Sequence, residues 1–264
     1  MNGLAYFKPT GLVRSSTAVA PGFSGGGATL YPTIANSLLW IDYANSYTDA
    51  SGLTPATEGQ SVQTIRLPSG WGASLGTGMV SQSNGISKPV YRSGDGLESQ
   101  NTNTLMALPA SISLTGAFTV YTVVNFHEVA TATLISISGR AAGFGGVLND
   151  IDTGNVFRAY SEDLGYFQSQ AYTATGLKML RQRRNAANAI FFAGTGLAEV
   201  AKSSSSYTWL LQDIFRRDSG VSGSTEGGVC IAQVVVVDDD TVTAGTDAAI
   251  QAALIAKTPG LTGI

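Results

Sequence analysis

The sequence predicts an all-β protein, a two-sheet antiparallel sandwich in jelly-roll form with one short C-terminal helix. Many short runs of β-branched and aromatic residues alternate with turn residues, and Gly alone accounts for 32 of 264 residues. Only one stretch has helical periodicity. Hydrophobic residues make up 44% of the chain and charged residues 12%, a balance that excludes a solvated, disordered polypeptide.

The centre of the predicted sheet is the stretch 116–137. Alternate side chains from Phe118–Phe126 fall on opposite faces, and both faces are β-branched or aromatic, as in a strand that is covered on each side. His127 and Glu128 interrupt the run, and residues 131–137 are predicted to form a second, antiparallel strand beside the first. The equally apolar stretch Val229–Val237 is expected to share the same core.

Shorter strands are expected around this centre. They are predicted at residues 37–43, 61–67, 88–91, 105–108, 155–160, 165–172, 178–184, 189–193, 197–202 and 209–216. The fifth and sixth of these form a predicted hairpin, and the seventh and eighth form another, with residues 185–188 as its turn. The helix is predicted at residues 246–257, with Thr246 as N-cap, Asp247 in the first turn, and Ile250 and Leu254 one turn apart.

Residues 1–35 read as an extended N-terminal arm, and residues 36–264 as the sandwich domain. The arm contains Gly25, Gly26 and Gly27 together with prolines and small polar residues, which favours an extended path. It is either a frayed tail or a segment that docks on a partner subunit, and Tyr6, Phe7 and Phe23 are the candidate docking residues. The low charge content favours a homo-oligomer over a monomer whose faces are rich in Ser, Thr and Asn.

Charge and cysteine content limit the partners that we expect. A net charge of −3 offers no general attraction to nucleic acid or to anionic lipid. Neither a signal-peptide pattern nor an apolar run long enough to span a membrane is present, which favours synthesis in a cytoplasm without membrane insertion. The single cysteine, Cys230, lies in an apolar strand and is expected to be a buried thiol.

Three pieces of sequence resemble a known family. Residues 38–52 (LLWIDYANSYTDASG) resemble an opening strand and polar turn, residues 88–126 a Pro-aromatic pair followed by a Gly-Phe-Thr-Val-aromatic strand, and residues 228–260 a strand, an acidic turn and a closing helix. In this order they resemble the concanavalin A-like, laminin-G-type jelly-roll domains of tailed-phage virion proteins. The sequence departs from that pattern around Trp71. The resemblance implies a sandwich fold and a virion location, and it identifies no ligand.

Acidic residues give no strong sign of catalysis. Glycosidases of this fold type use paired carboxylates, often in a Glu-x-Asp-x-x-Glu run, whereas the six glutamates here are scattered. No enzyme and no cofactor are therefore expected, and a polysaccharide hydrolase remains the weaker alternative. Asp150 and Asp152 lie in a short predicted loop that is either a calcium site or a simple turn. The run 238–240 reads as the cap of a strand end rather than as a cation site.

The basic and aromatic residues point to contact surfaces rather than to a catalytic site. Along the predicted strand 178–184, Arg181 and Arg183 share one face and Lys178 and Arg184 the other, which favours a solvated or intersubunit surface over a nucleic-acid groove. Aromatic residues near loops either stack on sugar rings or belong to the core; they are Trp71, Tyr91, Tyr160, Tyr166, Tyr172 and Tyr207. Trp71 and Tyr207 are the candidates for glycan stacking.

These inferences predict a non-enzymatic structural protein of a tailed-phage virion. It would be a surface module of the tail fibre, the baseplate or the capsid, made in the host cytoplasm and docked on other virion proteins. The alternative from another class is a lectin-like module that binds a host-surface glycan.

Overall fold

The computed structural model describes residues 31–72, 75–76, 78–82, 88–98, 104, 106–127, 135–136, 147–152, 156–161, 165–171, 175–204, 208–214 and 229–264. The predicted docking residues Tyr6, Phe7 and Phe23 lie outside these ranges. Among the described residues, no helix is both long and apolar enough to cross a membrane.

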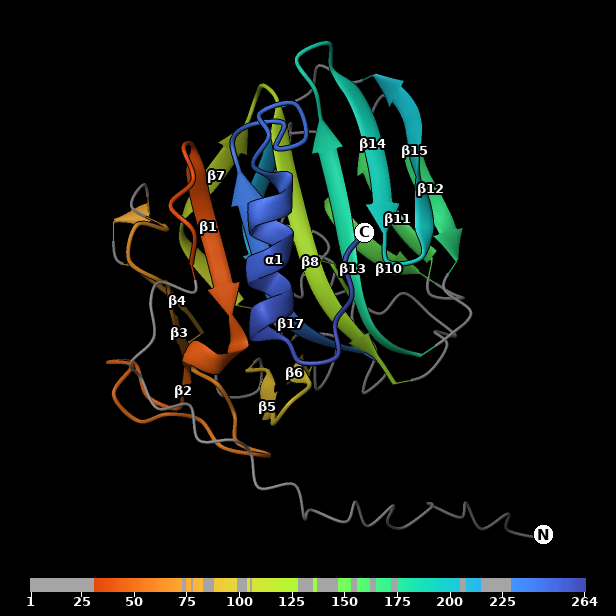
Figure 1. The fold of residues 1–264 in the computed structure, drawn as a ribbon. Coiled ribbons are helices and arrows are strands. Elements are labelled where there is room, and N and C mark those ends of the chain that lie inside the picture. Colours follow the sequence, from red (N-terminus) through yellow and green to blue (C-terminus); the bar gives the residue numbers. More distant parts are fainter. Residues whose placement is uncertain are drawn as a thin grey trace, which may run out of the picture.

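The largest sheet has eight antiparallel strands and carries the helix on its outer face (Figure 1). Its order is β15-β14-β13-β8-β17-β6-β5, and β1 also pairs with β17. The bounds of these elements are β1 Ser37–Asp42, β5 Val90–Arg92, β6 Gly96–Glu98, β8 Phe118–Phe126, β13 Gly176–Arg184, β14 Ala189–Gly194, β15 Leu197–Ser204, β17 Val229–Val237 and α1 Asp247–Lys257. A short 3-10 helix, η1, follows β1 at Tyr43–Asn45.

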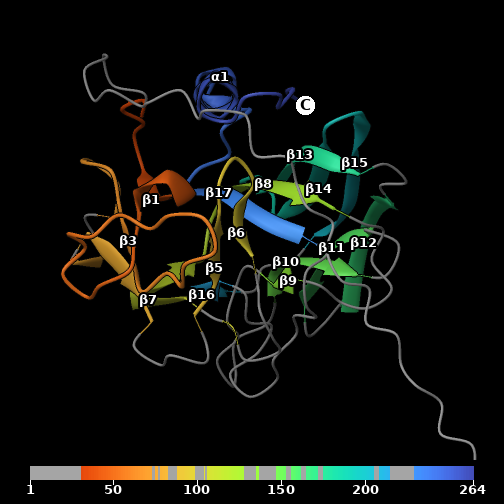
Figure 2. The same ribbon diagram turned by 90° about the horizontal axis from the view of Figure 1, so that it is seen from below.

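The opposite layer consists of two smaller antiparallel sheets, so the predicted sandwich is confirmed (Figure 2). One has the order β16-β7-β4-β3-β2 and the other β12-β11-β10-β9. Their strands are β2 Ser46–Tyr47, β3 Thr64–Arg66, β4 Met79–Ser81, β7 Met106–Leu114, β9 Ile135–Ser136, β10 Val147–Asp152, β11 Val156–Ser161, β12 Gly165–Ala171 and β16 Trp209–Ile214.

The predicted pairing of residues 131–137 with β8 is wrong. Both edges of β8 are occupied along their length, one by β13 and the other by β17, each of which offers nine residues. The strand that the structure describes in 131–137 is β9, which has two residues and pairs with β10 in the other layer. The long strands therefore outcompete the neighbouring short one for the backbone groups of β8.

Both faces of the central strands are buried, as their composition predicted. Between the layers, Phe118 packs against Trp209 with ring centroids 5.2 Å apart. On the outer face, Tyr121 and Val235 belong to a second core cluster that includes Ile250 of α1. The predicted core position of Val229–Val237 is confirmed, because every residue of β17 is buried.

The helix is joined to the sheet by buried hydrogen bonds that begin at Gln233. The indole Nε1 of Trp40 donates to Oε1 of Gln233 over 2.9 Å, and Nε2 of Gln233 donates to Oγ1 of Thr258 over 2.6 Å. Thr246 precedes α1 as predicted, but its side chain makes no capping hydrogen bond. Both ends of α1 instead depend on contacts with the sheet.

Candidate functional site

The predicted glycan-stacking residues do not form a site in the described structure. Trp71 is only 4% exposed and packs edge-on against Trp40, with ring centroids 5.0 Å apart and planes at 86°. The stacking role expected of Trp71 is therefore corrected, because its ring lies in the core beneath α1 and offers no free face. Tyr207 lies outside the described residues.

The predicted loop that contains Asp150 and Asp152 is a strand. Both residues lie in β10, where Asp150 is paired with Arg158 and Asp152 with Val156 of β11. The loop expectation fails because pairing with β9 and β11 outweighs the weak β propensity of the Asn and Asp residues. In the part of the chain that the structure describes, no group of three His, Cys, Asp or Glu side chains is arranged to hold a metal ion.

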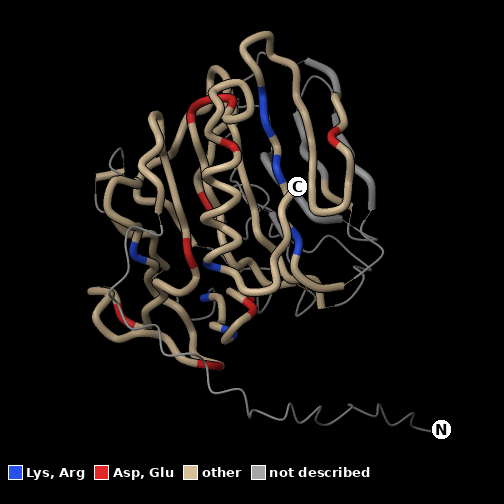
Figure 3. The backbone as a smooth tube through the Cα atoms, viewed as in Figure 1, with Lys and Arg blue, Asp and Glu red and all other residues tan. Residues whose placement is uncertain are grey.

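The three arginines of β13 are buried, which corrects the expectation of a solvated surface for them. Figure 3 shows them in a row along β13. Arg184 faces the sandwich interior, where it donates to the carbonyl oxygens of Gly116 and Leu114. Arg181 and Arg183 share the other face of the strand, as predicted, and both are more than nine-tenths buried.

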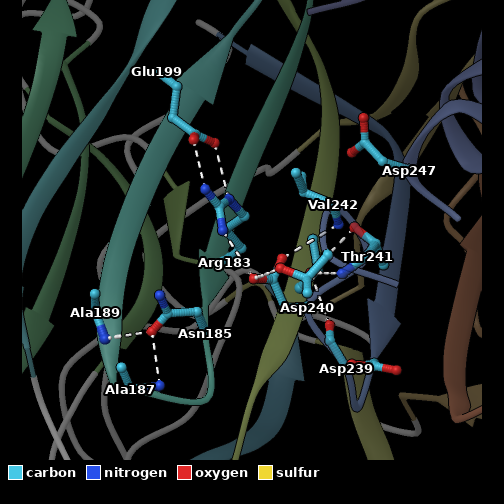
Figure 4. Close-up of polar contacts among 12 residues, drawn as sticks. Arg183, Asn185, Ala187, Ala189, Glu199, Asp239, Asp240, Thr241, Val242 and Asp247 are labelled. Carbon is cyan, nitrogen blue, oxygen red and sulfur yellow. Dashed lines mark hydrogen bonds and ion pairs between the residues drawn. The ribbon is translucent and has the colours of Figure 1, made fainter. Parts of the chain in front are cut away.

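An ionic network accounts for the burial of these two arginines, and Figure 4 shows the part of it that joins Arg183 to Glu199 and Asp240. Nη1 of Arg183 lies 2.9 Å from Asp240, and its Nη2 lies 2.6 Å from Glu199. Arg181 bridges Glu199 at 2.8 Å and Asp247 at 2.6 Å. Asp240 also accepts from the backbone N–H of Val242 in the turn that follows β17. The network thus fastens β13 and β15 to the turn before α1.

The carboxylate of Glu199 in this network is held in its ionised form. Burial alone would raise the pKa of Glu199, but hydrogen bonds and charge from Arg183 and Arg181 outweigh it, so that the pKa lies below its ordinary value. A general acid for glycoside cleavage needs the opposite shift. The ion pairs of the network hold the turn before α1 and the start of the helix against β13.

A second polar group lies where β1 and β8 end and where β5 turns into β6. Its centre is Asp42, which is 3% exposed and accepts from the Tyr31 hydroxyl over 2.8 Å. Nζ of Lys257, in the last turn of α1, lies 3.1 Å from the same carboxylate oxygen and 3.4 Å from the centroid of the Tyr31 ring. Burial, and after it the negative charge of Asp42, raises the pKa of Tyr31 and of Tyr91.

Two of these tyrosines form a half-buried aromatic pair. The ring centroids of Tyr43 and Tyr91 are 5.6 Å apart and their planes are inclined by 32°. Burial, then the neighbouring Tyr91 and Asp42, raises the pKa of Tyr43 to about 12, so its hydroxyl remains a hydrogen-bond donor at neutral pH. We call Tyr31, Asp42, Tyr43 and Tyr91 the tyrosine cluster.

Ordered polar side chains adjoin the tyrosine cluster. Asp95, in the β5–β6 turn, accepts from the side-chain amide of Asn125 over 2.9 Å. Nε2 of His127 lies 3.8 Å from Asp95 and 3.4 Å from the thiol of Cys230. Cys230 is wholly buried, as predicted, so its sulfur is not presented to a substrate.

Arg92 completes this end of the sandwich. It pairs with Glu98 on β6 and, over 3.2 Å, with Glu58 from the loop before β3. Oε2 of Glu58 also accepts from the backbone N–H of Ser93 over 2.7 Å. The side chains of Arg92 and Glu58 are 35% and 59% exposed, so they reach solvent although they are held in place.

Sequence reasoning found only one member of the tyrosine cluster, Tyr91, among its six aromatic candidates. Asp42 and Tyr43 fall within the predicted strand 37–43, and His127 is predicted only to end the run after Phe126. Tyr91 meets Tyr43 and His127 meets Cys230 only after β5–β6 and β8 have paired with β17. One local feature of the sequence could have indicated this site: Asp42, Tyr43 and His127 lie at the ends of predicted strands.

No protein-family model and no curated protein matches the sequence. Among solved structures, the fold resembles Trypanosoma rangeli sialidase in complex with sialic acid, at 10% identity and a TM-score of 0.48, over 78% of this chain and 31% of the sialidase. It also resembles the binding domain of Paraclostridial Mosquitocidal Protein 1, at 9% identity and a TM-score of 0.46, over 82% of this chain and 52% of that domain.

A further likeness is to botulinum neurotoxin type C, whose cell entry depends on interaction with two ganglioside molecules. The identity is 10% and the TM-score 0.45, over 83% of this chain and 51% of that one. This chain thus spans 31% of the sialidase and about half of each toxin structure. All three TM-scores lie below 0.5, so these likenesses carry no conclusion about the ligand of this chain.

Proposed function

We propose that this chain is a non-enzymatic, lectin-like module that binds carbohydrate at the tyrosine cluster. The observation that carries the proposal is the half-buried Tyr43–Tyr91 pair, bordered by polar side chains that are already fixed by one another. Tyrosine combines a flat apolar ring with a polar tip and loses little conformational freedom on binding. A pyranose ring offers a matching apolar face, with hydroxyl groups at its rim.

The fixed polar side chains favour binding of a ligand rich in hydroxyl groups. Glu58 is held by the backbone N–H of Ser93, so its carboxylate is oriented before a ligand arrives. Ordering side chains in advance reduces the entropy lost on binding. The carboxylates supply strong acceptors for hydroxyl donors.

The test is binding to a glycan array, followed by calorimetry on the best ligand. Tyr91→Ala is expected to weaken binding at least tenfold because it removes a stacking surface. Tyr91→Phe is the matched control, since it keeps the ring, and it is expected to retain binding within about threefold, equivalent to well under 1 kcal/mol. Equal affinities for the wild type and Tyr91→Ala would refute the assignment of the site.

The absence of catalysis is part of this proposal. It is supported by the depressed pKa of Glu199 and by the engagement of Glu58 and Glu98 with Arg92. Release of reducing sugar from a bound polysaccharide, lost when one of these carboxylates is replaced, would favour the hydrolase instead.

A position on a tailed-phage virion is the second part of the proposal, and the outward face of α1 supports it. The charged residues of the helix turn toward the sheet, where Asp247 meets Arg181 and Lys257 meets Asp42. The helix residues exposed to solvent are all apolar: Ala248, Ala249, Ala252, Ile255 and Ala256. A surface helix normally has the reverse arrangement, so this face fits a docking contact with another virion subunit.

Quantitative mass spectrometry of purified particles tests the virion position. Ile255→Lys is expected to reduce the copy number per particle, whereas Leu53→Lys, at an exposed apolar site away from the helix, is expected to leave it unchanged. Absence of the wild-type chain from particles would rule out this location.

A further inference from the structure

The polar groups of Tyr31 and Asp42 are already engaged inside the tyrosine cluster. The Tyr31 hydroxyl donates to Asp42 and also accepts from the side-chain amide of Asn45 over 2.9 Å. The same oxygen of Asp42 accepts from Lys257 over 3.1 Å. Its other oxygen accepts from the backbone N–H of Ala44 over 3.0 Å. These two side chains therefore shape the cluster, and a ligand has to be read by the other two tyrosines.

The hydroxyl groups of Tyr43 and Tyr91 each keep a proton that can be donated. Neither donates to a residue that the structure describes, and neither oxygen is among the described side-chain atoms that are buried without a partner, so both reach the surface. The oxygen of Tyr43 accepts from the backbone N–H of Gly94, so its proton points away from that bond. Burial raises the pKa of both tyrosines, so both remain neutral donors at neutral pH.

The ligand group that complements a phenol donor beside an aromatic ring is an acceptor joined to an apolar group. An N-acetyl substituent has both parts, because its carbonyl oxygen accepts and its methyl group can lie against a tyrosine ring. A sugar hydroxyl in the same place would need a further acceptor for its own proton and would leave the ring uncovered.

Resting on the proposed lectin function, we infer that the tyrosine cluster prefers glycans that contain an N-acetylhexosamine. The Tyr43 hydroxyl is the donor that reads the acetamido carbonyl, since it is the one whose oxygen is held by a backbone N–H. The half-buried pair of Tyr43 and Tyr91 supplies the aromatic surface for the methyl group.

The experiment compares two neutral oligosaccharides that differ only in their terminal sugar, which is N-acetylgalactosamine in one and galactose in the other. Each is titrated into the intact chain by calorimetry. The N-acetylated form is expected to bind at least tenfold more tightly, equivalent to about 1.4 kcal/mol. The physical reason is that a donor left without its acceptor weakens the binding of the analogue that lacks this group.

The variant Tyr43→Phe identifies the donor, because it removes the hydroxyl and keeps the ring. It is expected to lower the N-acetyl advantage to threefold or less and to leave the affinity for the galactose form within threefold. The matched control is Tyr47→Phe on β2, where the ring lies 5.3 Å from the guanidinium carbon of Arg66, and it is expected to change neither affinity. Circular dichroism checks that both variants fold.

The outcomes separate the two proposals. Equal affinities of the wild type for the two oligosaccharides, with binding still lost in Tyr91→Ala, would overturn the N-acetyl preference and leave the lectin function intact. An N-acetyl advantage that survives in Tyr43→Phe would overturn the role of its hydroxyl, and so would the loss of both ligands in that variant. Absence of binding to any glycan on the array would overturn the lectin function itself.

Discussion

Replacing Asp240 with asparagine tests whether the ionic network holds α1 on the sheet. The carboxylate is 3% exposed, and one oxygen accepts from both Arg183 and Thr243 over 2.9 Å. Asparagine keeps the shape but removes the charge that balances Arg183. Breaking a buried pair from one side costs about 3–5 kcal/mol. We expect about 3 kcal/mol, the low end of that range, because Arg183 keeps its two bonds to Glu199.

Thermal and urea unfolding followed by circular dichroism measure this loss. For a chain of this size, about 3 kcal/mol corresponds to a fall in Tm of roughly 6–12 °C. Hydrogen exchange should also quicken at the first turns of α1, because Asp240 pairs with Arg183, Asp247 pairs with Arg181, and Glu199 bridges the two arginines. The double variant Arg183→Met/Asp240→Asn should cost less than the sum of the two single variants, since no buried charge is left uncompensated.

The exposed pair Arg92–Glu58 is the matched control for this reasoning. Its side chains are 35% and 59% exposed, so Glu58→Gln should cost no more than about 1 kcal/mol. If Asp240→Asn costs as little as Glu58→Gln, the network does not hold the helix, and the argument from burial is refuted.

Three further predictions concern acid stability, backbone geometry and tyrosine titration. The depressed pKa of Glu199 contributes stability above its ordinary pKa of 4.5 that is lost as the pH falls, so urea midpoints should drop less in acid for Glu199→Gln than for the wild type. In urea melts, Gly96→Ala should lower the stability of the protein far more than Gly94→Ala. Both glycines have positive φ, but a Cβ at Gly96 would lie 2.4 Å from the carbonyl oxygen of Ile231, whereas a Cβ at Gly94 would meet no atom within 4 Å. Because the pKa of Tyr43 is raised to about 12, the stability that its protonated hydroxyl contributes is complete below pH 10 and is lost as the pH rises toward 12. The absorbance titration of Tyr43→Phe should therefore lack the component near pH 12 that the wild type shows.

The parts of the fold that were predictable are those in which local sequence and burial agree. Phe118–Phe126 and Val229–Val237 are apolar on both faces, and the structure covers both faces. The turn at residues 185–188 was predictable because Asn favours turns in which its side chain accepts from nearby backbone N–H groups. In the structure Asn185 accepts from the backbone N–H groups of Ala187 and Ala189.

The parts that were missed depend on contacts between distant residues. β10, with the sequence VLNDID, has weak strand propensity and exists because β9 and β11 pair with it. The partner of β8 was misassigned because its true neighbours lie far away along the chain. Its position near a predicted loop made Trp71 a stacking candidate, whereas its ring packs against Trp40 of β1 in the core. The site at Tyr43 and Tyr91 required this long-range pairing as well.

The pairing of β1 with β17 has a consequence for how the chain reaches its folded state. Trp40 and Gln233, which hydrogen-bond across this pair, are 193 positions apart in sequence. During synthesis β1 emerges long before β17, the strand with which it pairs. The apolar residues of β1 therefore remain exposed until β17 has been made. Pairing between strands so far apart in sequence slows folding and prolongs the lifetime of aggregation-prone intermediates. Nascent chains that stop short of Val229 should therefore depend on chaperones, and refolding of the whole chain should be slow and sensitive to protein concentration.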